Sequence, residues 1–392
     1  MMDSRKYAGM PKEKLEMFLT KLNGGVDFRQ IFQNVRKDCY RPGGFSIDPR
    51  TGDEIIFSTS RDKRPTTYNG EKCVICKGEE SEILPFLMAQ KLSSGAYSFV
   101  NENKYAFLNP DGVFLLGGKG RKEDDGIPLR GGNFLVWPTT EHKEIYEIPY
   151  EDHAVSFHLM RKLEGIFLSG VFEEISGRES VQVIKNSGSS IPGSHVHGPY
   201  QVTCSNRNLR KINDDIKFMK REGISFAEFL DKDCEPLLQI ADYDTMKLAV
   251  HKYSRRPLEA VIYPKDKNVE VFGDLNDKQL TDLARVTSDV SFALSFLMPA
   301  MKRSFDYSFG FHIGKGIGTM YVEVFPSSQR PGGFERLGRY ICQGTPPQTA
   351  AIYRNFLNVL AKGNIITRYD LDPTDEYTIN YINRQFIQPA LK

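Results

Sequence analysis

The segment from Asn186 to Gln201, NSGSSIPGSHVHGPYQ, constrains this chain more than any other part of its sequence. It follows residues 180–184, which alternate like a β-strand, and it opens with small and glycine-rich residues. A strand that leads into a Gly/Ser loop leaves backbone N–H groups available to bind an anion. His195 and His197 place two imidazoles on one side of an extended backbone, because side chains repeat with a period of two. The pattern favours a nucleophilic imidazole beside a bound phosphate, and a polar surface loop that merely carries two histidines is the alternative.

The composition is that of a soluble globular protein. The 392 residues are 40% hydrophobic and 26% charged, which leaves room for two domains or halves with a sizeable core. The net charge of +2 gives no reason to expect a nucleic-acid or membrane partner. No apolar run approaches the ~18–20 residues that span a bilayer, and the N-terminus lacks the apolar core of a signal peptide. Six scattered cysteines with one close pair do not suggest a disulfide framework, so we expect a cytoplasmic location.

The hydrophobic periodicity predicts an α+β fold. The predicted helices are 11–37, 150–169, 208–235, 276–300 and 346–360. The predicted strands are 45–48, 54–58, 97–100, 105–108, 113–116, 133–137, 180–184, 239–241, 247–253, 260–264, 307–314 and 320–325. Because strands, a helix and strands that end at a histidine occur twice, we expect two halves related by duplication. The expected parts are an N-terminal helical extension, 1–44, a first half, 45–207, and a second half, 208–392.

Cys73-Val-Ile-Cys76 has the spacing with which two thiolates reach one zinc ion from a tight turn. A redox pair or two ordinary thiols are the alternatives. A tetrahedral site needs two further ligands, and the histidines of this half are His142, His153, His158, His195 and His197. A site made of Cys73, Cys76, His142 and His195 would leave His197 free for chemistry, although spacing alone does not establish that grouping.

Arg61 and Arg64 lie in a dense basic patch, Arg61-Asp-Lys-Arg64-Pro65, in a predicted loop. Two guanidinium groups three residues apart suit bidentate contacts with phosphate oxygens. A solvated run of charge is the alternative interpretation of such a patch.

Taken in order, these segments resemble the galactose-1-phosphate uridylyltransferase family, the nucleotidyltransferase and phosphorylase branch of the histidine-triad superfamily. The matching segments of the first half are Arg61–Pro65, Cys73-Val-Ile-Cys76-Lys-Gly78, Val100-Asn101-Glu-Asn103-Lys-Tyr105-Ala106, Val136-Trp-Pro138 with His142, and Asn186-Ser-Gly188 with Gly193-Ser194-His195-Val-His197. Those of the second half are Tyr307-Ser-Phe-Gly310-Phe-His312, Phe325-Pro326, 334–340 and Thr345-Pro-Pro-Gln-Thr-Ala350-Ala351. The resemblance extends over residues 45–355.

The resemblance implies two histidine-triad-like halves, each an antiparallel sheet with packed helices, and a covalent nucleotidyl-histidine. It makes His197 the nucleophile, and a neighbouring main-chain carbonyl such as that of Gly198 the acceptor for its second ring N–H. It makes Cys73, Cys76, His142 and His195 the ligands of a structural zinc ion. It implies that substrate or nucleotide is bound by Arg61, Arg64, Asn101, Asn103, Asn186, Gly188, Ser189, Ser190, Gly193, Ser194, Gln201 and His312. The implied partners are a nucleotide-sugar or related nucleotide, a phosphate-bearing acceptor, and a second copy of the chain in a homodimer.

Two departures from the family pattern keep alternatives open. Pro199 stands where the uridylyltransferases place Gln, and the nearest Gln is Gln201. A phosphorylase that uses inorganic phosphate as acceptor is therefore a rival to the sugar 1-phosphate transferase, and a non-catalytic nucleotide-binding module is a third candidate. Tyr321-Val-Glu323 replaces the family's second metal-binding His-x-His, so His312 and Glu323 are either paired ligands or a hydrogen-bonded pair, and we expect no complete second metal site.

Overall fold

The fold is built on one large antiparallel sheet. The computed structural model describes residues 9–22, 44–58, 73–83, 86–108, 112, 128–169, 180–188, 198–361 and 374–391. In this part of the chain, ten strands form the sheet, and every neighbouring pair is antiparallel. They are β3 (Phe86–Lys91), β4 (Tyr97–Glu102), β5 (Gly131–Trp137), β6 (Ser180–Ser187), β7 (Tyr200–Ser205), β8 (Gln239–Asp242), β9 (Met246–Ala249), β10 (Ala260–Pro264), β11 (Tyr307–His312) and β12 (Tyr321–Pro326).

The strand order repeats itself across the sheet. It runs β3-β4-β5-β7-β6 and then β11-β12-β10-β9-β8. Each half therefore orders its strands first, second, third, fifth, fourth, and the two fourth strands, β6 and β11, pair at the centre. A long helix follows the third strand in each half, α5 (Tyr150–Leu168) in the first and α8 (Asp277–Ala300) in the second. This repeat supports the expected duplication, which stays a prediction, and the expected boundary after residue 207 falls between β7 and the next helix, inside one continuous sheet.

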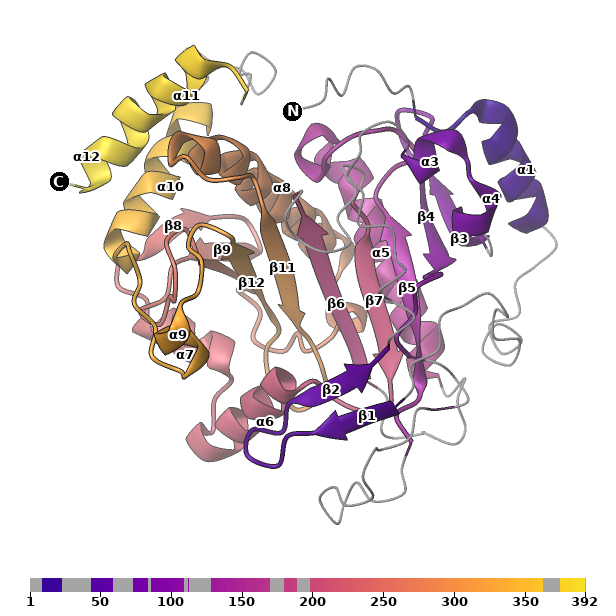
Figure 1. Ribbon diagram of the computed structural model, residues 1–392, viewed down its shortest axis with the longest axis horizontal. Helices are drawn as coiled ribbons and strands as arrows, with labels where there is room; N and C mark the ends of the chain where they lie inside the picture. The colour runs from indigo at the N-terminus through magenta and orange to yellow at the C-terminus, as the bar shows by residue number, and fades with distance from the viewer. Residues whose placement is uncertain are drawn as a thin grey trace.

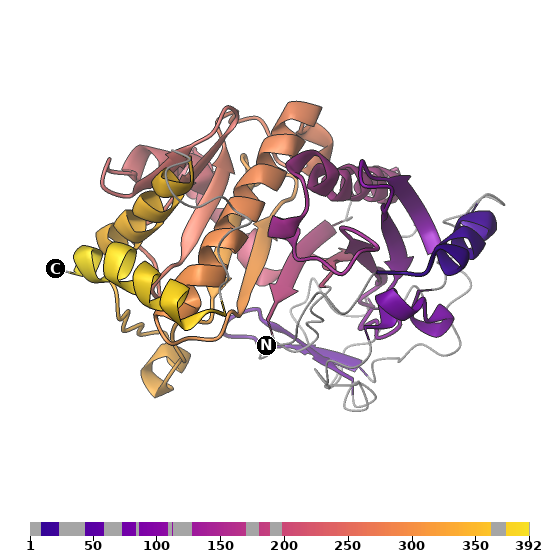
Figure 2. The same ribbon diagram turned by 90° about the horizontal axis from the view of Figure 1, so that it is seen from above.

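The helices α5 and α8 cover one face of the sheet (Figures 1 and 2). Their buried residues form one core with the inward side chains of the strands, among them Val181 and Val183 of β6. Helix α8 begins at a capping box, in which Asn276 Oδ1 accepts a hydrogen bond from the Gln279 backbone N–H at 2.9 Å. The other helices of the described residues are α1 (Lys12–Leu22), α3 (Val74–Lys77), α4 (Glu80–Ile83), α6 (Arg210–Glu222), α7 (Phe226–Asp233), α9 (Gly333–Arg336), α10 (Pro346–Ala361), α11 (Glu376–Ile382) and α12 (Gln388–Leu391). None of these described helices is long and apolar enough to cross a membrane.

The opposite face, which we call the outer face, is covered mainly near its two edges. At one edge α1 and Ile75 of α3 pack on aromatic residues of the first half, such as Phe99 and Trp137. At the other edge α7 packs on residues of β9, β10 and β12. Between these clusters the outer-face side chains of Asn186, Gln201 and Ser308 are partly exposed and Ile184 is 36% exposed, whereas Gln182, Thr203 and His312 are buried. The outer face therefore has an open centre around Ile184, Asn186, Gln201 and Ser308.

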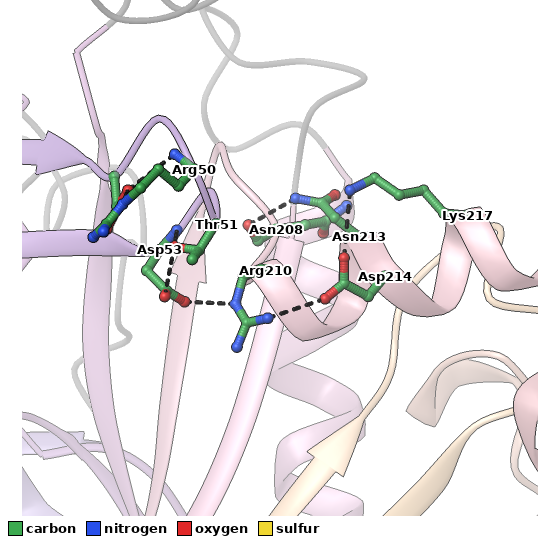
Figure 3. A network of polar contacts seen from close by, with 9 residues as sticks. Arg50, Thr51, Asp53, Asn208, Arg210, Asn213, Asp214 and Lys217 are labelled. Atoms are coloured by element: carbon green, nitrogen blue, oxygen red, sulfur yellow. Dashed lines mark hydrogen bonds and ion pairs between the residues drawn. The ribbon is translucent and has the colours of Figure 1, made fainter. Parts of the chain in front are cut away.

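A two-stranded ribbon, β1 (Gly44–Ile47) and β2 (Glu54–Phe57), lies on the outer side near the ends of the central strands (Figures 1 and 2). Glu54 of the ribbon forms an ion pair of 2.7 Å with Arg207, which follows β7. Asp53 pairs with Arg210 at the start of α6, and Arg210 also reaches Asp214 at 3.4 Å (Figure 3). The ribbon, which leads along the chain to residues 61–64, is thus tied to the start of α6.

Most of the predicted elements are present, with specific differences. The prediction of a strand at 105–108 is wrong, because the backbone N–H groups of Phe107 and Leu108 both bind Asn133 Oδ1 at 2.9 Å instead of a neighbouring strand. The predicted helix 208–235 is two helices, since Gly223 takes a left-handed conformation at φ +72° and Ser225 caps α7. Strand β3 was not predicted. Residues 23–37 and 113–116 lie outside the described ranges.

Candidate active site and metal centre

The segment predicted to hold the nucleophile connects β6 to β7 in the middle of the sheet. The predicted site residues outside the described ranges are Arg61, Arg64, Ser189, Ser190, Gly193, Ser194, His195 and His197. The residues that flank this segment are described, from Asn186 to Gly188 on one side and from Gly198 to Gln201 on the other. They define where the chain leaves β6 and where it enters β7.

Gly188 directly follows the last residue of β6, at a position where only glycine fits. Its φ of +110° is one that other residues rarely adopt. A Cβ atom there would lie 2.0 Å from Asp306 Oδ1 and 2.5 Å from the Phe305 carbonyl oxygen. The close approach brings the start of the predicted phosphate loop against the segment that precedes β11.

Asn186 and Gln201 both lie on the outer face and are partly exposed. Asn186 is opposite Ser308 of β11, and the Ser308 hydroxyl donates a hydrogen bond of 2.8 Å to Asn186 Oδ1. Gln201 is opposite Ile184 of β6, and all of these side chains are partly exposed or exposed. The two predicted substrate residues therefore lie on the same face, on adjacent strands and next to the predicted nucleophile segment.

Asn101 and Asn103 are buried and bind protein atoms. Asn101 Oδ1 accepts a hydrogen bond of 2.7 Å from the indole N–H of Trp137. Asn103 Oδ1 accepts one of 2.9 Å from the backbone N–H of Tyr105 and holds the turn after β4. Contacts of either residue with a nucleotide stay a prediction.

Three of the four predicted zinc ligands come together. Cys73 precedes α3, Cys76 lies within α3, and His142 lies in the turn after β5. Their potential ligand atoms all lie within 4.8 Å of one another, and Cys76 Sγ is 3.2 Å from His142 Nδ1. Ile75 packs in the same hydrophobic cluster as Trp137, which holds the short Cys-x-x-Cys helix against the end of β5. Two thiols and an imidazole fit a zinc ion, so this cluster could hold a metal.

His312 lies between charged side chains of α6 and β12. Its Nδ1 atom lies 2.6 Å from Asp215 Oδ2, and its Nε2 atom lies 2.9 Å from Glu323 Oε2. The Lys211 ammonium binds the same Glu323 oxygen at 2.7 Å. Carboxylates lie beside both ring nitrogens, so His312 and Glu323 form a hydrogen-bonded pair in the structure. The buried ring is only 5% exposed, so the predicted substrate contact of His312 would require this cluster to open.

Sequence reasoning missed the charged residues beside these sites. No sequence motif predicts that Asp215 and Lys211 of α6 contact residues of β11 and β12. Lys185 offered a signal, because the period of two puts it on the same side of β6 as Val181 and Val183, which face the core. A lysine that faces the core beside two valines is unusual, and it indicates that the residue has a functional or structural role.

The fold belongs to the class seen in solved uridylyltransferases and related phosphorylases. A uridylyltransferase structure superposes with a TM-score of 0.62 at 17% identity, covering 80% of this chain and 98% of that one. A GalT-like protein from Arabidopsis thaliana gives a TM-score of 0.58 at 18% identity, covering 79% and 98%. An ADP-glucose phosphorylase from the same plant, with bound ADP-glucose, gives 0.56 at 20% identity, covering 79% and 98%. The sequence matches no protein-family model and none of the curated proteins.

Proposed function

We propose that this protein is a nucleotidyltransferase that moves a nucleoside monophosphate between a nucleotide-sugar and a sugar 1-phosphate through a covalent nucleotidyl-histidine at His197. The observation that supports the proposal is the connection between two central strands. In the sequence, His195 and His197 lie between β6 and β7, which are central strands of a sheet whose fold is similar to those of a uridylyltransferase and an ADP-glucose phosphorylase. Asn186 and Gln201 flank this connection on the open centre of the outer face.

The chemistry proceeds as two displacements at one phosphorus atom. A neutral imidazole nitrogen of His197 attacks the α-phosphorus, and a P–N bond forms while the bond to the leaving phosphate oxygen breaks. The electron pair leaves with that oxygen. A phosphate oxygen of the acceptor then attacks the same phosphorus, and the imidazole is released. Arg61, Arg64 and the backbone N–H groups of residues 189–194 would hold the negative charge that moves between the oxygens.

A zinc ion would be held by Cys73, Cys76, His142 and His195. Four protein ligands leave no open position for water or substrate, so the ion would have a structural task. Because three of the ligands lie beside the end of β5 and the fourth lies two residues before His197, the ion would fix the nucleophile segment to the first half of the sheet.

A phosphorylase is the second candidate, favoured by Pro199 at the position where uridylyltransferases place Gln. The two activities share the nucleotidyl-histidine and differ in the acceptor. Intact-protein mass after brief exposure to a panel of nucleotide-sugars would detect the adduct, and its mass would name the nucleotide. Chasing the adduct with inorganic phosphate or with sugar 1-phosphates would then separate the two. Discharge by phosphate alone would contradict the transferase.

The variant His197→Ala tests the nucleophile, with His158→Ala as the matched control, since His158 lies on α5 beside Arg161. We expect the adduct to vanish in the first variant and to persist in the second. A wild-type protein that binds nucleotides, forms no adduct and turns over no nucleotide-sugar would be the non-catalytic module.

A further inference from the structure

Lys185 is a buried cation that holds the chain next to the predicted nucleophile. Its side chain lies on the inner side of β6 and the residue is 1% exposed. The ammonium nitrogen donates a hydrogen bond of 2.6 Å to the carbonyl oxygen of Gly198. Gly198 immediately follows His197 in the sequence and precedes β7.

The surroundings of Lys185 keep the ammonium aimed at that carbonyl. The nitrogen lies 5.3 Å from the centre of the Tyr200 ring, a distance at which the ring face attracts a cation. Glu144, near the end of the turn that carries His142, attracts the ammonium electrostatically. Glu144 in turn accepts a hydrogen bond of 3.3 Å from the Ser187 hydroxyl, two residues along the same side of β6. Burying a charged side chain costs free energy. We therefore infer that the ammonium group of Lys185 has a role that a neutral side chain would not fill.

We propose that Lys185 is a positioning residue of the reaction proposed above, which sets the direction in which the chain leaves His197 by fixing the Gly198 carbonyl from the core side. Because α5 and α8 cover the face on which it lies, we expect Lys185 to act without contacting the substrate. A shift of the peptide after His197 would move the imidazole away from the α-phosphorus. A misplacement of about 1 Å costs a reaction on the order of 10²-fold in rate.

The strand pairing explains why this contact is specific to Lys185. Lys185 and Tyr200 are opposite each other in the β6–β7 ladder, so the lysine reaches past the first residue of β7 to the Gly198 carbonyl, two residues before it. Val183, two residues earlier on the same side, packs in the core and lies opposite Val202. Val183 therefore offers a control on the same strand and the same side, whose side chain has no donor for the Gly198 carbonyl.

The test compares Lys185→Met, Lys185→Arg and Val183→Ala in the full-length protein. In single-turnover measurements of adduct formation, we expect Lys185→Met to lower the maximal rate constant about 100-fold while the donor concentration at half-maximal rate changes less than about threefold. Lys185→Arg, which keeps charge and donors, should recover part of the rate. Val183→Ala should lower the unfolding temperature and keep the rate constant within about threefold of wild type. A rate loss in Val183→Ala equal to that in Lys185→Met would overturn the proposal.

Backbone hydrogen exchange in peptides that cover residues 194–201 gives a readout that needs no activity. We expect faster exchange there in Lys185→Met than in wild type or Val183→Ala, and unchanged exchange would overturn the inference. A wild-type protein that forms no adduct would contradict the proposed function instead, and the exchange rates would still decide whether Lys185 holds this segment. For the case in which Lys185→Met fails to fold, Lys185→Gln keeps a donor without the charge, and its exchange rates are read in the same way.

Discussion

His312 Nδ1 lies 2.6 Å from Asp215 Oδ2, and this buried contact joins β11 to α6. On the other side of the ring, Nε2 lies 2.9 Å from Glu323 Oε2 in β12. Because each carboxylate accepts a hydrogen bond, both ring nitrogens donate, which is the pattern of the charged imidazolium. The same short helix carries Arg210, which is paired with the β1–β2 ribbon (Figure 3). Helix α6 therefore links the ribbon of the first half to the central strands of the second.

The His312 cluster should make stability depend on pH. Burial alone would lower the pKa of His312, but its hydrogen bonds to Asp215 and Glu323 outweigh burial and raise it above 6.5. A raised pKa in the folded state contributes stability that is fully present below the unfolded value and is lost as pH rises through the folded value. We therefore expect the free energy of unfolding to fall more steeply in the wild type than in His312→Gln as the pH rises above about 6.5. Urea unfolding in a series of buffers measures both slopes, and parallel curves would contradict the prediction.

Glu323 of the same cluster should make the protein lose stability as the pH falls, the opposite direction to His312. Burial would raise the pKa of Glu323, but the hydrogen bond from His312 and the nearby charges of His312 and Lys211 lower it below its usual range. Its contribution is present above the unfolded pKa and is lost as pH falls through the folded one. The same urea series, extended below about pH 4, should show Glu323→Gln losing less stability than the wild type on acidification.

Removal of metal should destabilise the first half of the protein. We expect Cys76→Ser to lose a bound zinc ion and to lower the unfolding temperature, because its thiol lies 3.2 Å from His142 Nδ1 in the ligand cluster. Cys342→Ser is the control and should keep the ion. Cys342 is far from the predicted ligands in the sequence, and its thiol donates a hydrogen bond to the Gly344 carbonyl. Metal analysis of both variants and thermal unfolding with and without a chelator make the comparison. Equal zinc content in the two variants would refute the ligand set.

Gly188→Ala should be much more costly than Gly223→Ala. Both glycines have positive φ values, +110° and +72°, so both substitutions incur backbone strain of roughly 1–2 kcal/mol. At Gly223 no heavy atom lies within 4 Å of the added Cβ, whereas at Gly188 the Cβ would meet Asp306 and Phe305. Denaturant unfolding should therefore show a loss of at least about 3 kcal/mol for Gly188→Ala and about 1 kcal/mol for Gly223→Ala. Similar losses would show that the contact with residues 305–306 relaxes.

The two ion pairs of the ribbon should differ in strength. Glu54 and Arg207 are 16% and 17% exposed, whereas Asp53 and Arg210 are 51% and 41% exposed. Water screens the second pair more strongly, so we expect Asp53→Asn to cost less than about 1 kcal/mol. Glu54→Gln should cost about 1–3 kcal/mol, since it weakens a charge-assisted hydrogen bond that is partly buried. Urea unfolding of the two variants at equal ionic strength measures both losses of unfolding free energy. A larger loss in Asp53→Asn than in Glu54→Gln would contradict the prediction.

Much of the architecture was predictable because it depends on local patterns. The period of two in 180–184 and the period of 3.6 in 276–300 identify β6 and α8 without any partner, since each pattern records which side faces the core. The strand expected at 105–108 failed for the complementary reason. These residues do not pair with a neighbouring strand, because the backbone N–H groups of Phe107 and Leu108 donate hydrogen bonds to Asn133 Oδ1.

The sequence by itself determined which chemistry to propose, through the Gly/Ser loop, the His-x-His pair and the Cys-x-x-Cys spacing, because these patterns depend on residue types a few positions apart. Only the tertiary structure decided which distant groups meet. His142 reaches Cys76, Asp215 and Glu323 enclose His312, and Lys185 reaches the Gly198 carbonyl. Spacing along the chain does not encode those contacts, since they arise when strand pairing and helix packing bring together residues that are separated by 11 to 97 positions. The segment NSGSSIPGSHVHGPYQ is therefore the basis of the proposed reaction, and the contact of buried Lys185 with the Gly198 carbonyl is known only from the fold.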